Sequence, residues 1–337
     1  MQTDVLVDTI DTHTAGEPTR ILTSGFNRTW DRGLSIAEKR DRFAEDQDHL
    51  RRLLMCEPRG HDDMFGAVTV EAQDERADLG LFFMDGDGYL DMCGHGTIGV
   101  VTALIETGEL PAKSLITFET PAGLVRAWPT IEDGRVESVT VRNVTSYVYE
   151  SLTVPLDVGG ESRSVPVDVV IAGNTFALVD AEVVDLEIRP EHAETFVDLG
   201  LELRSKINGR HDVVDPFTGE TRPVDITEFY EKGEEADRNV VVFADGQVDR
   251  SPCGTGTCAK MTLLYEEAKL EIEEPYPYES IIGTEFTGRL VDVEDRDGIA
   301  VTTPEVTGSA SITGLHTFVR DETDDLEGFS LSGRQAQ

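Results

Sequence analysis

The sequence predicts an α/β protein built from two similar domains, and three observations lead to this fold class. The chain has 337 residues, about twice the usual size of a domain, so two cores are expected. Short apolar runs typical of strands alternate with segments of helical periodicity. The pentapeptide Cys-Gly-x-Gly-Thr occurs twice, at 93–97 and 253–257, and the two copies are 160 residues apart. An internal repeat of this kind indicates two domains of related structure.

In the first half, helices and strands follow from capping and periodicity. Ser35 and Glu38 have the spacing of a capping box, and apolar residues then recur at helical intervals. Cys56 ends this helix and is interpreted as a small buried apolar residue. Polar turns, including a tight turn over 85–88, separate the other segments. The expected elements are a helix over 36–55, strands over 66–70 and 79–84, and a helix over 98–105 that the first Cys-Gly-x-Gly-Thr motif opens.

The second half repeats this alternation. Its apolar runs are rich in β-branched residues, which favours strands. Pro190 is expected to begin a helix, because proline is favoured in a first turn. No low-complexity segment or long linker interrupts the chain, so closely packed domains are expected. The expected elements are strands over 136–141, 165–171, 239–243 and 288–293, and helices over 190–207 and 258–265, the latter opened by the second motif.

Composition excludes several classes of function. There are 66 Asp+Glu against 29 Lys+Arg, a formal net charge of -37, and no basic cluster longer than Arg51–Arg52, so nucleic-acid binding is not expected. The apolar runs are shorter than the ~20 residues of a membrane span. The first residues do not resemble a signal peptide, so a cytoplasmic location is expected. The Asp and Glu residues are spread along the whole chain and lysine is rare, which predicts adaptation to high salt. An ordinary acidic surface is the alternative.

The cysteines do not suggest metal or disulfide chemistry. Cys56, Cys93, Cys253 and Cys258 form no CxxC pair, so neither zinc nor a structural disulfide is expected. Neither G-x-G-x-x-G nor a phosphate-binding loop occurs. Lys260 lies within a predicted helix without a recognisable pyridoxal-phosphate motif. The residues therefore point to no zinc, pyridoxal-phosphate, dinucleotide or phosphate-loop site.

The repeated motif places a cysteine at the start of a helix. The positive end of the helix dipole and unpaired backbone N–H groups favour thiolate and lower the thiol pKa. The N–H groups after each cysteine are suited to binding a carboxylate. If the two domains face each other, one thiolate can remove a proton from a bound acid while the other thiol returns one from the opposite side, which inverts the stereocentre.

Other interpretations of the motif remain open. Glycine-rich cysteine segments also occur as tight turns with packed cysteines. Cys93 and His95 have the residue types of a nucleophile and base in a hydrolase, but that interpretation leaves the second copy unexplained. A binding protein of the same fold without catalysis is a further alternative.

Four segments carry a resemblance to a known family. Residues 11–20, 57–66, 91–99 and 249–257 resemble the proline racemase family, and the resemblance extends over nearly the whole chain. It implies a fold similar to that of diaminopimelate epimerase, with a mixed sheet wrapped around a central helix in each domain. The implied domains are 1–124 plus 305–337, carrying Cys93, and 125–304, carrying Cys253. The last strand, around 308–319, would return to the first domain.

The resemblance also implies the roles of the site residues. Cys93 and Cys253 would be the catalytic acid/base pair, acting without cofactor or metal. Asp249 would accept a hydrogen bond from the ring ammonium of the substrate. The remaining substrate-binding residues would hold the substrate carboxylate, and they are Gly94, His95, Gly254 and Thr255.

Four positions bear on the substrate. Dehydratases of the family typically have threonine where this chain has Cys253, so inversion is favoured over elimination. Hydroxyproline epimerases typically carry a histidine where Ile226 stands, and Phe243 resembles the aromatic wall of the racemases. Thr175 departs from the usual second aromatic, which indicates a roomier or more polar pocket. Proline racemase is therefore ranked before 4-hydroxyproline 2-epimerase.

Further aromatic residues and the oligomeric state complete the expectations. Phe65 and Phe176 are candidates for the pocket wall, with core packing as the alternative for them and for Phe243. The expected partner is a small amino acid. A homodimer is left open.

Overall fold

The computed structural model describes residues 3–27, 33–326 and 328–330. The chain forms two compact units, the first from Met1–Val141 with Gly308–Gln337 and the second from Arg142–Thr307. The expected divisions were after residues 124 and 304. The first division lies later because the strand Gly123–Glu132 pairs antiparallel with the strand Ile116–Thr120 and so stays with the first unit.

The first unit is a mixed sheet with two helices. β18, β1 and β2 are antiparallel neighbours, β2 is parallel to β3, and β3 is antiparallel to β4. β4 pairs with β5 and runs parallel to β6, which pairs antiparallel with β7. The elements are β1 (Thr3–Thr14), β2 (Glu17–Leu22), α1 (Ile36–Met55), β3 (Gly66–Val70), β4 (Leu79–Met84), β5 (Tyr89–Leu90), α2 (Gly94–Glu106), β6 (Ile116–Thr120), β7 (Gly123–Glu132), β8 (Arg135–Arg142) and β18 (Ala310–Asp321).

The second unit repeats this order of pairings. β9, β10 and β11 are antiparallel, β11 is parallel to β12, and β12 is antiparallel to β13. β13 pairs with β14 and runs parallel to β15, which is followed by antiparallel β16 and β17. The elements are β9 (Tyr147–Val158), β10 (Glu161–Ala172), β11 (Asn174–Asp180), α3 (Ala193–Asn208), β12 (Ile226–Glu231), β13 (Asp237–Phe243), β14 (Gln247–Asp249), α4 (Gly254–Glu266), β15 (Tyr276–Glu279), β16 (Glu285–Arg296) and β17 (Ile299–Gly308), with short 3-10 turns at Ala181–Val184 and Pro190–His192.

The two sheets correspond strand by strand, with one difference in chain order. β18 occupies the place beside β1 that β9 occupies beside β10. The C-terminal strand thus completes the first unit, as the resemblance implied. The structure confirms the predicted fold class of two similar mixed α/β domains.

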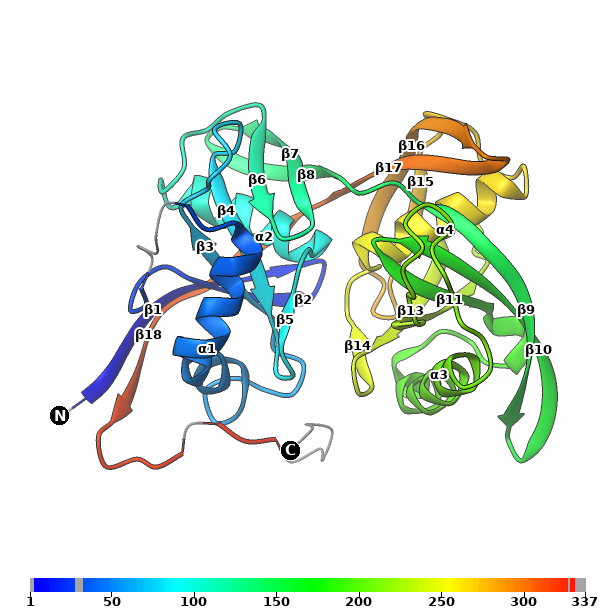
Figure 1. The fold of residues 1–337 in the computed structure, drawn as a ribbon, viewed down its shortest axis with the longest axis horizontal. Coiled ribbons are helices and arrows are strands. Elements are labelled where there is room, and N and C mark those ends of the chain that lie inside the picture. Colours follow the sequence, from blue (N-terminus) through cyan, green and yellow to red (C-terminus); the bar gives the residue numbers. More distant parts are fainter. Residues whose placement is uncertain (1–2, 28–32, 327, 331–337) are drawn as a thin grey trace. The chain divides into compact units, whose positions relative to one another are not determined.

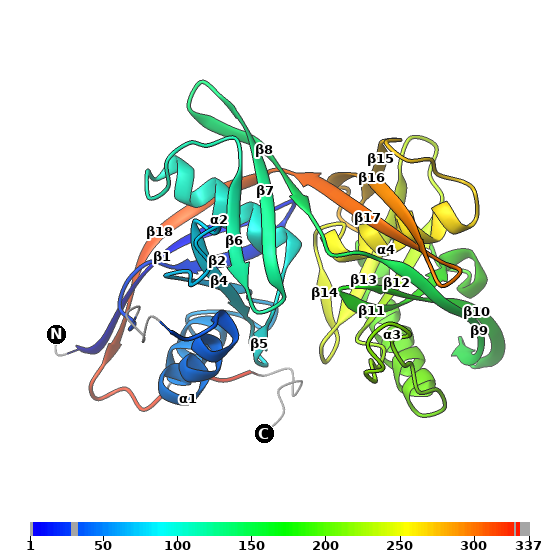
Figure 2. The same ribbon diagram turned by 45° about the horizontal axis from the view of Figure 1, so that its top comes forward.

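Each sheet surrounds one helix that is buried on all sides. α2 contacts β1, β2, β3, β7 and β18, and α4 contacts β9, β10, β11 and β16. Residues 95–105 of α2 and 254–263 of α4 are all buried. Most residues of both helices are small or apolar, and a helix with so few charged side chains is stable inside a core. Figures 1 and 2 show α2 and α4 among the strands of their own units.

The other two helices each cover a sheet with one apolar face. Ser35 and Glu38 form the predicted capping box at the start of α1. Phe43 of α1 is fully buried and packs edge to face on Phe82 of β4, with ring centroids 5.6 Å apart. α3 places Phe196 in the corresponding core, 5.0 Å from Phe229 of β12. The apolar contacts of α1 and α3 stabilise the sheet of each unit.

Some of the elements predicted from the sequence agree with the structure residue by residue. Other strands of the structure were not predicted. The strands over 66–70 and 79–84 are β3 and β4, and the turn over 85–88 is present before β5. α2 and α4 begin directly at the glycine after each cysteine. β1 and β2 were not predicted, because their buried side chains include many threonines and charged residues. Cys56 is buried, as predicted.

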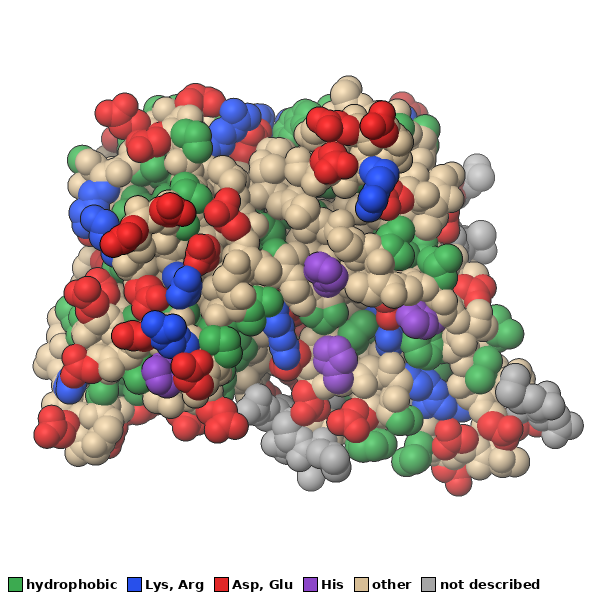
Figure 3. Space-filling model, turned by 180° about the vertical axis from the view of Figure 1, so that it is seen from behind, with side chains coloured by type: hydrophobic (Ala, Val, Ile, Leu, Met, Phe, Trp, Pro, Cys, Tyr) green, Lys and Arg blue, Asp and Glu red, His purple; other side chains and the backbone are tan. Residues whose placement is uncertain are grey.

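Carboxylate side chains are scattered over the face drawn in Figure 3. They lie on both units and are not gathered in one patch. Among the helices in the described part of the chain, none has the length and apolar composition needed to span a bilayer.

Candidate active site

The first Cys-Gly-x-Gly-Thr motif forms a helix start in the first unit, here called the first half-site. Cys93 is the N-cap of α2, and the backbone N–H of Gly96 donates to its Sγ at 3.4 Å. The Thr97 hydroxyl donates to the Cys93 carbonyl oxygen at 2.6 Å. Both contacts fix the cysteine at the positive end of a buried helix. The sulfur lies where an anionic ligand of that helix end would also bind.

His95 lies beside the Cys93 sulfur. Its Nδ1 is 3.2 Å from Sγ, and its ring packs against Phe65 with centroids 4.7 Å apart. The Thr14 hydroxyl of β1 donates to the His95 carbonyl oxygen at 2.9 Å. Burial lowers the pKa of the His95 imidazole to about 3, so the ring is neutral at physiological pH. A neutral imidazole can donate one hydrogen bond to a thiolate or a substrate carboxylate without adding charge.

The neutral state of His95 leads to an expected pH dependence. Its ring resonances should not titrate between pH 5 and 8, because the folded pKa lies far below the ordinary value of about 6.5. Because the unfolded chain takes up a proton on this histidine more readily than the folded protein does, the contribution of His95 to folding stability is present above about pH 6.5. It is lost as the pH falls towards the folded pKa. Histidine NMR spectra of the protein and of His95→Gln would assign the resonance. A His95 signal with a midpoint near 6.5 would contradict this arrangement.

The second motif forms the corresponding helix start in the second unit, here called the second half-site. Cys253 is the N-cap of α4, and the backbone N–H of Gly256 donates to its Sγ at 3.4 Å. Thr255 Oγ1 lies 3.5 Å from the same sulfur, in the place in the motif that His95 has in the first unit. Unlike Cys93, Cys253 has a positive φ of 59°, a strained conformation for a residue with a Cβ.

A chain of hydrogen bonds holds Cys253 in this conformation. The Ser251 hydroxyl and backbone N–H both donate to Asp249 Oδ1, at 2.7 and 2.8 Å. The Cys253 N–H in turn donates to the Ser251 hydroxyl oxygen at 3.1 Å. Burial raises the pKa of the Asp249 carboxyl to about 6. Asp249 therefore lies in the second half-site, held beside Cys253 through Ser251.

The environment of Cys253 corrects one expectation. The helix end was expected to lower the thiol pKa, but burial raises the pKa of Cys253 well above its ordinary value, and the Asp249 carboxylate raises it further. Desolvation and like charge outweigh the helix dipole here. Cys253 is therefore suited to donate a proton as a thiol.

The predicted pocket residues differ in exposure. Phe65 is buried beside His95, and Ile226 is buried at the start of β12. Phe176 is fully buried on β11, opposite Ile226 in the register of β11 and β12. Phe243 is partly exposed at the end of β13. Thr175 is fully buried, and its Oγ1 has no hydrogen-bond partner among the described residues.

The remaining predicted ligands lie on the helix ends themselves. Gly94 and Gly254 begin α2 and α4, so their N–H groups belong to the first turn, where the helix has no internal acceptors. Thr14 and Ser251 were not predicted, because their bonds to the half-sites depend on the fold. For Ser251, its place two residues before Cys253 was the one sequence feature that could have indicated a contact with the second half-site. In the described part of the chain, no group of three or more His, Cys, Asp or Glu side chains is arranged to hold a metal ion.

Each half-site therefore combines one thiol with a helix end, and the second adds the buried carboxyl group of Asp249. A thiol can give or take a proton, and the backbone N–H groups can stabilise negative charge that develops on a carboxylate. This chemistry suits proton transfer at a carbon next to a carboxylate.

A family model, curated relatives and a solved structure all relate the chain to the same group of proteins. The family model described as proline racemase matches residues 9–330. The chain is 42% identical to the proline racemase of Clostridioides difficile, over 96% of this chain and 98% of that protein. It is 37% identical to the 4-hydroxyproline 2-epimerase of Streptosporangium roseum, over 98% of this chain and 100% of that protein. A crystal structure of a hydroxyproline epimerase from Agrobacterium vitis with bound trans-4-hydroxy-L-proline has a TM-score of 0.86 at 29% identity, covering 98% of this chain and 97% of that one.

Proposed function

The chain belongs to the proline racemase family, and from this premise we propose that it interconverts L- and D-proline with Cys93 and Cys253 as its two acid/base groups. It is an isomerase of the kind that acts without pyridoxal phosphate. The observation that carries the proposal is the pair of matching helix ends, each capped by a cysteine whose sulfur accepts the N–H of the second glycine of the motif. Two such thiols are what inversion by two bases requires.

The proposed reaction moves two protons. One cysteine, as thiolate, takes the proton from the α-carbon, and the bond between that carbon and its hydrogen breaks. The other cysteine, as thiol, gives its proton to the opposite face of the same carbon. Backbone N–H groups at the starts of α2 and α4 would stabilise the charge that builds up on the substrate carboxylate between the two steps. The enzyme then holds the reverse pattern of thiol and thiolate.

Three features support a ring without a hydroxyl group. Cys253 provides a thiol where dehydratases typically have threonine, which favours inversion over elimination. Ile226 is apolar and buried, so it offers no hydrogen bond to a ring hydroxyl. Phe243, partly exposed at the end of β13, is proposed to form an aromatic wall.

One observation favours the second candidate, 4-hydroxyproline 2-epimerase. The buried Thr175 hydroxyl oxygen lacks a hydrogen-bond partner in the described residues, and it could serve a hydroxylated ring. The Agrobacterium vitis enzyme binds such a substrate.

The test compares L-proline with trans-4-hydroxy-L-proline under the same conditions, with optical rotation as the readout. We expect a kcat/KM at least about tenfold higher for proline, a difference of about 1.4 kcal/mol in transition-state binding. A preference for the hydroxylated ring would assign the chain to the epimerases. Absence of turnover with both, without a change in melting temperature on adding the flat inhibitor pyrrole-2-carboxylate, would contradict enzymatic function of this kind.

We also propose that the acidic surface is an adaptation to high salt. The net charge of -37 and the carboxylates spread over both units repel each other at low ionic strength. Moving from about 0.01 to about 1 M KCl shortens the Debye length from about 30 to about 3 Å. The melting temperature should therefore rise steeply with KCl. A melting temperature that is the same at both concentrations would exclude this adaptation.

A further inference from the structure

A buried carboxylate lies beside the second half-site, next to the glycine whose N–H donates to the Cys253 sulfur. Glu228, on β12, is fully buried. A Cβ placed on Gly256 would lie 2.2 Å from Glu228 Oε2 and 3.2 Å from the Cys253 Cβ. Gly256 is also the residue whose N–H donates to the Cys253 sulfur. The carboxylate and the cysteine therefore share one small space above the first turn of α4.

The first half-site provides a matched comparison. The glycine in the same place of the motif is Gly96, and a Cβ there would lie 2.5 Å from the ring of Phe83 on β4. The space that holds a carboxylate beside Cys253 holds an aromatic ring beside Cys93. The two copies of the Cys-Gly-x-Gly-Thr motif thus have neighbours of different charge, and the motif alone does not show this difference.

Resting on the function proposed above, we propose that Glu228 is a positioning residue that sets the balance of thiol and thiolate at Cys253 and makes the two half-sites unequal. As a carboxylate it disfavours a second negative charge on the nearby sulfur, so Cys253 stays a thiol. When Cys253 gives its proton to the substrate, a proton taken up from solvent by Glu228 removes that repulsion. The pair then titrates as a unit.

The groups that face Glu228 leave it able to change charge. Burial raises its carboxyl pKa to about 7, while the Tyr278 hydroxyl, which donates to Oε1 at 2.6 Å, and the charge of Lys260 lower it. The Asn239 amide, which also donates to the Pro252 carbonyl oxygen at 2.7 Å, lowers the pKa of Glu228 as well. The facing groups come from β15, β13, β14 and α4, and they are Tyr278, Asn239, Asp249, Lys260 and Cys253.

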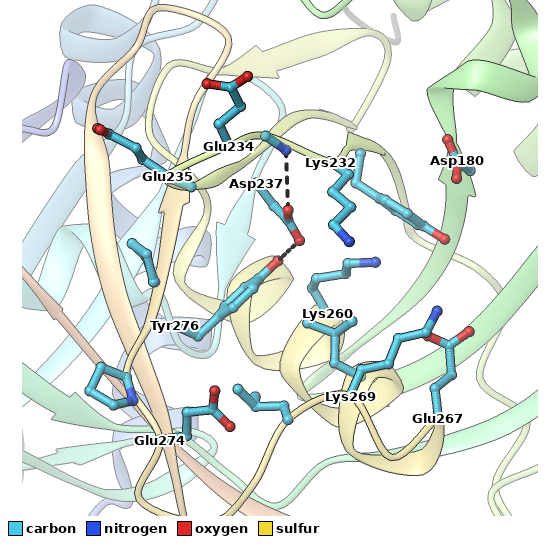
Figure 4. A pocket seen from close by; sticks show the side chains of 17 residues that line it. Asp180, Lys232, Glu234, Glu235, Asp237, Lys260, Glu267, Lys269, Glu274 and Tyr276 are labelled. Atoms are coloured by element: carbon cyan, nitrogen blue, oxygen red, sulfur yellow. Dashed lines mark hydrogen bonds and ion pairs between the residues drawn. The ribbon is translucent and has the colours of Figure 1, made fainter.

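Lys260 does not neutralise Glu228 through a direct ion pair. No ion pair joins the two among the described residues; the Lys260 ammonium lies over the Tyr230 ring, 3.1 Å from its centroid. Figure 4 shows Lys260 pointing into a cavity of about 610 Å³, on the side that also holds Lys232. The negative charge of Glu228 is therefore compensated only in part, and Cys253 experiences it.

The test measures alkylation of each cysteine by iodoacetamide as a function of pH, with peptide mass spectrometry separating Cys93 from Cys253. In Glu228→Gln, the midpoint for Cys253 should fall by about one pH unit or more, and that for Cys93 should not move. The basic limb of the kcat/KM profile should fall with it, because the active form needs one thiol. Glu228→Asp should restore most of the wild-type profile. Melting curves would establish that each variant is folded.

Asp237→Asn is the matched control. Asp237 is a carboxylate on β13 that accepts a tyrosine hydroxyl of β15, from Tyr276 at 2.9 Å, as Glu228 does from Tyr278. Figure 4 shows this pair at the edge of the cavity. The control should leave both alkylation midpoints unchanged.

A second variant keeps the proposal testable if Glu228→Gln does not fold. Tyr278→Phe removes a hydrogen bond that lowers the carboxyl pKa of Glu228, so Cys253 should be alkylated at lower pH. An unchanged Cys253 midpoint in a folded Glu228→Gln or Tyr278→Phe variant would overturn the proposal. A shifted midpoint in a protein without racemase activity would support the role of Glu228 and contradict the proposed function instead.

Discussion

Cys93→Ser and Cys253→Ser are each expected to lower the rate of racemisation by at least about 10²–10⁴, because general acid–base catalysis contributes about that factor and each variant removes one of two required groups. A serine hydroxyl in the same place can neither take the α-proton as an anion at neutral pH nor give one as readily as a thiol. The measurement is the initial rate of optical rotation with each enantiomer of proline.

The chain offers two matched controls for the loss of a thiol. Cys56 in the first unit and Cys258 in the second are both buried and lie outside the Cys-Gly-x-Gly-Thr motifs. Cys56→Ala and Cys258→Ala should retain most of the activity, since neither sulfur caps a central helix. If either catalytic variant keeps full activity while its fold is intact, two cysteines are not both required.

Arg20→Met is expected to cost about 3–5 kcal/mol of unfolding free energy, the usual cost of removing one partner from a buried ion pair. Arg20 of β2 pairs with Asp11 of β1, with Nη2 2.8 Å from Oδ2 and Nε 3.0 Å from the same oxygen. Its Nη1 also donates to the carbonyl oxygens of Leu54 and Arg59, each at 2.7 Å. The guanidinium thus ties a hairpin to the end of α1, and its loss leaves Asp11 buried without its partner.

Urea denaturation in molar KCl would measure this cost, and Arg76→Met would be the control. The Arg76 side chain is 74% exposed and pairs with Asp74 at 2.6 Å, so its removal should change stability little. Equal midpoints for Arg20→Met and Arg76→Met would contradict a structural role for the buried pair.

Local sequence patterns predicted the elements whose side chains pack in a simple way. The capping box at Ser35 and the apolar runs of β3 and β4 depend on neighbouring residues, so they could be recognised without the fold. β1 could not be predicted in this way. Its buried polar side chains, such as Thr9 and Asp11, are satisfied by contacts with each other and with Arg20 across the hairpin.

In the candidate site, too, the residues that are contiguous in sequence could be predicted, and those brought in by other strands could not. The repeat located Cys93 and Cys253, because the motif and the helix that follows it are contiguous in sequence. Glu228 and Phe83 come from other strands, and only the folded sheets bring them to the motif glycines. The raised pKa of Cys253 was missed for the same reason: burial, its main cause, cannot be seen in a helix start alone.

The incorporation of solvent deuterium tests two-base racemisation most directly. L-proline would be incubated with the protein in D₂O and molar KCl and stopped while little has reacted, and the label at the α-carbon would be measured in each enantiomer. In the proposed mechanism the proton removed and the deuteron returned belong to different cysteines, so the D-proline formed should be labelled and the remaining L-proline should not. Equal early labelling of both enantiomers would show that one group exchanges its proton and returns it to either face, and would contradict the two-cysteine mechanism.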